Sequence, residues 1–143
     1  MAEQSYQRHT RFLPPFHFFV VPVLLVNVIN EGRHLWMEPT RHFAWQLVFA
    51  VALLMAAFVA RQQALTVQDR VIRLEMRLRL AEVLSADLRA RIPEFTVGQL
   101  ISMRFASDAE LAGLARKVLD EKMSDHKAIK RLVKDWQGDY ARA

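Results

Sequence analysis

The stretch that decides the fold is FLPPFHFFVVPVLLVNVIN at residues 12–30, followed after a short polar segment by FAWQLVFAVALLMAAFVA at residues 43–60. Neither run contains an Asp, Glu, Lys or Arg. Each is close to the roughly 20 residues that a helix needs to cross the hydrocarbon layer of a membrane. The two runs therefore predict a transmembrane helical hairpin.

The segment that separates the runs, Glu31 to Arg41, contains Gly32 and Pro39 and is predicted to be the connection. A connection this short requires antiparallel neighbouring helices. The alternative, a cleaved secretory leader, needs a small-x-small cleavage site after the first run, and Asn27 to Glu31 does not provide one. We therefore expect the first helix to be retained.

Positive charge is distributed unevenly along the chain. Of the 20 Lys and Arg residues, 4 precede Ala60 and 16 follow it, with a net charge of +5. Cytoplasmic flanks of membrane helices are enriched in Lys and Arg. The arginines that carry this argument are Arg8 and Arg11 before the first run, and Arg61, Arg70, Arg73, Arg77 and Arg79 after the second. The connection has only Arg33 and Arg41, so both termini are predicted to be cytoplasmic.

The same arginines are candidates for lipid contact. Basic side chains beside a membrane segment attract anionic headgroups, each by on the order of 1 kcal/mol near the surface. We therefore expect anionic lipid as a partner, with contacts at Arg61, Arg70, Arg73, Arg77 and Arg79.

Two sets of residues within the runs suggest helix contacts. Asn27 and Asn30 share one helix face, where amides need hydrogen-bond partners unless they lie at the membrane interface. The second set repeats every fourth residue, a small-residue stripe that lets another helix come close: Ala52, Ala56 and Ala60. The first run is its nearest candidate partner, and ordinary alanine abundance is the alternative explanation.

Residues 61–92 contain no Gly or Pro and are predicted to continue the second helix into the cytoplasm as an amphipathic, basic helix. An apolar seam follows heptad spacing through Val67, Val71, Leu74, Leu78 and Ala81, and Leu88 and Ile92 extend it. Ile72, Met76, Leu80 and Leu84 form a second stripe, expected beside the first. Residues 72–80 also alternate as a half-buried strand does, but a lone strand has no pairing partner.

The last third of the chain, residues 93–143, predicts a small helical domain with visible helix starts. Thr96 with Gln99 and Ser107 with Glu110 match the capping box, and Ser124 is expected to cap a basic helix that runs to about Trp136. So small a domain buries little surface alone, so we expect it to pack on the long helix or on a partner.

Nothing in the sequence specifies catalysis, a cofactor or a metal site. The chain has no cysteine and only four glycines, and it lacks phosphate-loop, dinucleotide and zinc motifs. His17 falls at the opposite end of the hairpin from His42, so these two cannot share a metal within one chain. His34 and His42 lie on the same side and could meet a metal, but they have no obvious carboxylate partner beyond Glu31 and Glu38, so the histidines are expected to be interfacial polar groups. The basic helix at residues 127–134 is diluted by aspartates, which argues against nucleic acid.

Several segments together resemble a known family. They are Tyr6, His9 to Phe12 and Phe16-His17, then Val67 to Glu75, Arg104 to Asp108, Lys130 and Trp136. These resemble a family of small bacterial two-span membrane proteins that is catalogued only as a domain of unknown function. The resemblance covers nearly the whole chain and implies a bacterial cytoplasmic membrane location, but no activity.

The sequence thus predicts an all-α membrane protein in three parts: a hairpin in residues 1–60, a helix at 61–92 and a helical domain at 93–143. We expect a non-enzymatic structural, adapter or accessory subunit that forms a homo-oligomer or joins a larger membrane complex. The alternative is an oligomeric minimal transporter or channel with Asn27, Asn30 and Gln46 as polar residues. The absence of charge within the runs weakens it.

Overall fold

The computed structural model describes residues 13–139, and within that range it is all helical apart from turns and one isolated antiparallel bridge between Ala106 and Trp136. The chain divides into two compact units, which for the described residues are 13–65 and 66–139. Helix α2 (Arg41–Val83) contributes residues to both. Arg8 and Arg11, on which part of the orientation argument rests, lie outside the described residues.

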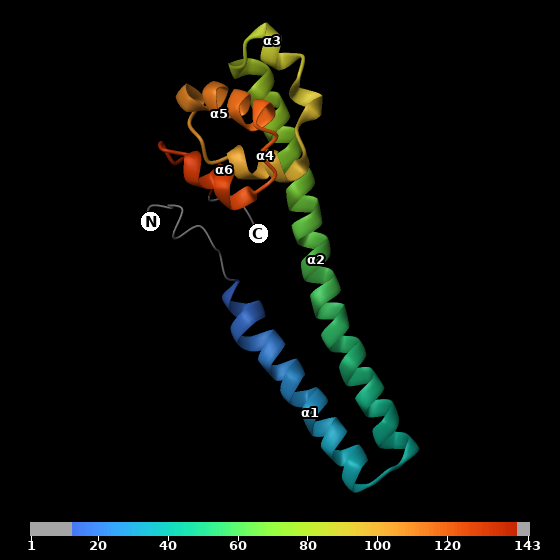
Figure 1. The fold of residues 1–143 in the computed structure, drawn as a ribbon. Coiled ribbons are helices and arrows are strands. Elements are labelled where there is room, and N and C mark those ends of the chain that lie inside the picture. The colour runs from blue at the N-terminus through green and yellow to red at the C-terminus, as the bar shows by residue number, and fades with distance from the viewer. Residues whose placement is uncertain (1–12, 140–143) are drawn as a thin grey trace. The chain divides into compact units, whose positions relative to one another are not determined.

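The first unit is an antiparallel helical hairpin (Figure 1). A π-helical turn (Phe16–Val20) leads without a break into α1 (Val21–Met37), and Pro22, which has no N–H to donate, follows directly after that turn. The rings of Phe16 and Phe58 meet edge to face at 6.0 Å, and His34 stacks on Phe43 at 5.3 Å. Aromatic contacts therefore join the two helices near both ends of the hairpin.

The predicted connection is wrong in its extent. Helix α1 continues through Gly32 to Met37, so only residues 38–40 form the turn. Proline disfavours helical geometry in the residue before it, and Glu38 accordingly leaves the helix with φ −134° and ψ 88°. The Thr40 hydroxyl then accepts a hydrogen bond from Phe43 N at 3.3 Å. Pro39 ends the first helix, whereas a single glycine does not.

The long second helix is confirmed, but its predicted end is wrong. Helix α2 is one helix of 43 residues, which also excludes a strand at 71–80. It stops at Val83 rather than near Ile92, and Ser85 adopts extended geometry to begin α3 (Ala86–Arg89). Because the chain leaves the axis of α2 at this point, the side chain of Leu88 packs into the core, with only 3% of its surface exposed.

The second unit packs a small helical domain against the C-terminal part of α2 (Figure 1). A 3-10 turn (Ile92–Glu94) precedes α4 (Val97–Met103), α5 (Asp108–Asp120) and α6 (His126–Leu132). The core contains the α2 residues Ile72, Met76, Leu80 and Leu84 together with buried side chains of the later helices. The expectation that this domain packs on the long helix is confirmed.

The predicted helix starts are correct in part. Thr96 and Gln99 form the expected capping box on α4. Ser107 precedes α5 but its side chain makes no capping bond, and the Glu110 N–H donates to the Ser107 carbonyl at 3.2 Å instead. The Glu110 carboxylate accepts from Lys134 N and Asp135 N at 3.1 and 3.2 Å. Asp125, not Ser124, caps α6, and α6 ends at Leu132 rather than at Trp136.

Candidate functional site

The C-terminal part of α2 has two apolar faces, of which one is buried and the other is exposed. Ile72, Met76, Leu80 and Leu84 are at most 4% exposed, since the small domain covers them. Ala81 of the predicted seam is partly buried, and Leu88, predicted to extend it, is buried in the core. The other residues of the seam are exposed by 59, 49, 61 and 60%, respectively: Val67, Val71, Leu74 and Leu78. We call these four residues the exposed seam.

The two stripes are not neighbours, as the sequence suggested, but lie on nearly opposite sides of α2. A helix turns by about 100° per residue, so nine residues separate Val71 and Leu80 by about 180°. A domain that packs on the Leu80 side therefore leaves the Val71 side uncovered. The exposed seam is the largest regular apolar feature of the second unit that the described residues leave without a partner.

The five predicted lipid-contact arginines differ in their surroundings. Arg70 and Arg73 are exposed, Arg61 is partly buried, and Arg77 is partly buried with its Nε unpaired among the described residues. Arg79 is occupied inside the second unit. Its Nε donates to Asp108 Oδ1 at 2.6 Å, and its terminal nitrogens donate to the carbonyls of Arg104 and Ala106 at 3.2 and 2.6 Å.

Glu75 lies four residues before Arg79, a spacing that allows an ion pair on a helix, but Glu75 forms no ion pair within residues 13–139. The Arg79 guanidinium instead reaches from α2 to two backbone carbonyls of the segment before α5 and to the carboxylate of Asp108, the first residue of α5. Nearby, Arg104 pairs with Asp139 at 3.0 Å, and Phe105 stacks on Trp136 with ring centroids 4.3 Å apart. Sequence spacing gave no signal for these long-range contacts.

The polar and small residues of the hairpin face outward. Asn30 is exposed and Asn27 partly buried, and neither side-chain amide makes a hydrogen bond within residues 13–139. The alanine stripe is also exposed at all three positions: Ala52, Ala56 and Ala60. Ala50, only 1% exposed, is the buried alanine of α2, so the first run does not cover the predicted stripe.

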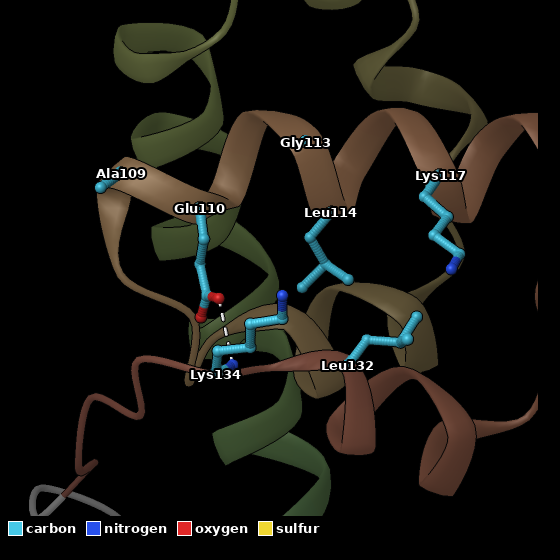
Figure 2. Close-up of a pocket in the computed structure, with 7 residues that line it drawn as sticks. All are labelled: Ala109, Glu110, Gly113, Leu114, Lys117, Leu132 and Lys134. Atoms are coloured by element: carbon cyan, nitrogen blue, oxygen red, sulfur yellow. Dashed lines mark hydrogen bonds between the residues drawn. The ribbon is translucent and has the colours of Figure 1, made fainter.

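Among the described residues, no group of three or more His, Asp and Glu side chains is arranged to hold a metal ion. A hollow of about 400 Å³ lies between α5 and the segment after α6, and Figure 2 shows Leu114 and Leu132 at its wall beside Glu110 and Lys134. Glu110 is already bonded to two backbone N–H groups, which gives it a structural role.

One carboxyl in the second unit has a perturbed proton affinity. The hydroxyl of Ser85 donates a hydrogen bond to Asp87, and this bond is the main cause that lowers the pKa of Asp87. The N–H of Leu88 and the guanidinium of Arg116, which pairs with Asp87 at 3.0 Å, act in the same direction. Asp87 lies in the first turn of α3, so these contacts stabilise the N-terminal end of that helix.

A family model described as "Family of unknown function (DUF6526)" matches residues 1–143, the whole chain. No curated protein and no solved structure matches the chain.

Proposed function

Because the chain belongs to this family of unknown function, we propose a role from its own residues. We propose that it is a non-enzymatic integral membrane protein, in which the hairpin is the anchor. Its cytoplasmic helical region then serves as a structural, adapter or accessory subunit that contacts a partner. The observation that carries this role is the exposed seam on α2.

Two helices are long and apolar enough to cross a membrane, Phe16–Met37 and Arg41–Val83. By length and composition alone, a core helix of a soluble protein also meets this test. A core helix is covered by its own chain, however, whereas Phe18, Ile29 and Phe58 are all exposed. Apolar side chains on the outer surface of both helices favour a lipid environment.

Aromatic residues support the same assignment. Trp36 lies in the last turn of α1 and Trp45 in the first turns of α2, and both indoles are exposed. Tryptophan prefers the boundary between the hydrocarbon and the headgroups. The turn at residues 38–40 then lies just outside one face of the membrane.

We assign that turn to the outside and the second unit to the cytoplasm, in a bacterial cytoplasmic membrane. The positive-inside rule supports this orientation, because arginines are concentrated after the second span. The resemblance to bacterial two-span proteins supports the choice of membrane.

Cysteine labelling tests the proposal, and the native chain has no cysteine to interfere. We expect the full chain to remain in alkali-washed membranes. In intact cells, Met37→Cys should react with an impermeant maleimide, whereas Ser124→Cys should react only after lysis. Recovery in the soluble fraction would contradict the anchor, and the reverse labelling pattern would contradict the orientation.

A further inference from the structure

Charged residues flank the exposed seam on both sides and constrain which partner can cover it. Heptad positions follow from the 4-3-4 spacing, with Val71 and Leu78 at a, and Val67 and Leu74 at d. The g positions beside the seam are then Arg70 and Arg77, and the e positions are Gln68, Glu75 and Glu82. One edge of the seam is thus basic, and the other edge is mostly acidic.

We propose that the exposed seam binds the same seam of a second copy of this chain as a parallel, two-stranded coiled coil. This inference rests on the proposed membrane anchor, which gives both copies the same orientation. In a parallel pair, each g residue faces the e residue five positions later in the other chain. Arg70 then faces Glu75 of the second copy, and Arg77 faces Glu82 of the second copy.

The same charges oppose the antiparallel arrangement. Antiparallel helices bring g opposite g and e opposite e, so arginine would face arginine and glutamate would face glutamate. No ion pair within residues 13–139 engages Arg70, Glu75, Arg77 or Glu82. These four charges are therefore available for contacts between chains.

The central pair of seam residues fits two strands. Val71 at a with Leu74 at d is the combination of a β-branched and a γ-branched residue that favours dimers, whereas Val67 at d and Leu78 at a do not follow that rule, so the flanking charges carry the choice of partner and orientation. Two heptads are short for a free coiled coil in water. Confinement to one membrane raises the effective concentration of the two helices, and α2 is already held helical by the domain behind it.

Disulfide cross-linking of the full chain in membranes tests the arrangement. Val67→Cys and Leu78→Cys should each form a disulfide with their own counterpart. The control Arg73→Cys is also exposed but lies away from the seam, and it should not cross-link. The arrangement would be overturned if neither seam cysteine reacted, if Arg73→Cys reacted equally, or if Val67→Cys joined only to Leu78→Cys in differently tagged chains.

Charge exchange tests the partner. In the Val67→Cys background, Arg70→Glu places acidic residues on both edges of the first heptad, and Glu75→Arg places basic residues there. Each variant alone should lose most of its cross-linking, whereas co-expression of the two should restore it as a heterodimer. A loss that co-expression does not restore would overturn the proposed pairing, provided that amide exchange in α5 shows the domain intact.

The experiments distinguish a wrong membrane anchor from a wrong dimer. A chain recovered in the soluble fraction contradicts the proposed function. A chain that remains in membranes, with the expected maleimide labelling but no seam disulfide, contradicts only the dimer.

Discussion

At the scale of single residues, Arg79 joins α2 to the segment before α5. Its side chain is 27% exposed, and it bonds one carboxylate and two carbonyls. Hydrogen bonds to a charged group are each worth about 1.5–3 kcal/mol, partly offset by water in the unfolded state. We expect Arg79→Ala to lower the opening free energy of the second unit by about 2 kcal/mol, measured by hydrogen exchange of the α5 amides.

The matched control is Arg73→Ala, which removes an exposed arginine without an ion pair in the described residues. Its effect should stay within about 0.5 kcal/mol, as for ordinary surface substitutions. Equal effects of the two variants would mean that the bonds of Arg79 add nothing to the stability of the domain.

At the scale of the element, α2 gives a matched pair of leucines only two residues apart. Leu80 is fully buried and Leu78 is 60% exposed. Truncation of a buried leucine leaves a cavity and costs about 2–5 kcal/mol. Leu80→Ala should therefore accelerate exchange of the α5 amides strongly, whereas Leu78→Ala should leave it almost unchanged in dilute micelles. If Leu78→Ala destabilised the domain as much, the seam would be covered from within the chain.

At the scale of the whole molecule, the proposed membrane anchor predicts that distance from the membrane selects which arginines contact lipid. Arg61 directly follows the apolar run, and Arg73 lies about 18 Å further along α2 at 1.5 Å per residue. That separation exceeds the Debye length of about 8 Å at physiological ionic strength. Arg61→Gln should lower retention of anionic lipid by about fivefold, the equivalent of about 1 kcal/mol, as measured by native mass spectrometry.

Arg73→Gln is the matched control and should retain lipid as the unaltered chain does. A larger loss from Arg73→Gln than from Arg61→Gln would show that the C-terminal part of α2 lies along the membrane surface rather than projecting away from it.

The sequence by itself determined the helical class, the two apolar runs, the unbroken helix through Ala60 and the identity of both apolar stripes on α2. These features follow from local composition and periodicity, which act within a few helical turns. Only the tertiary structure decided that the Leu80 stripe is buried and the Leu78 stripe exposed, that α2 ends at Val83, and that Arg79 bonds Asp108 rather than Glu75. The Arg79–Asp108 bond joins residues 29 positions apart, and the Leu80 stripe is buried by helices that follow α2 in the chain. Burial and pairing are set by the segment that packs against a face, and periodicity does not identify that segment.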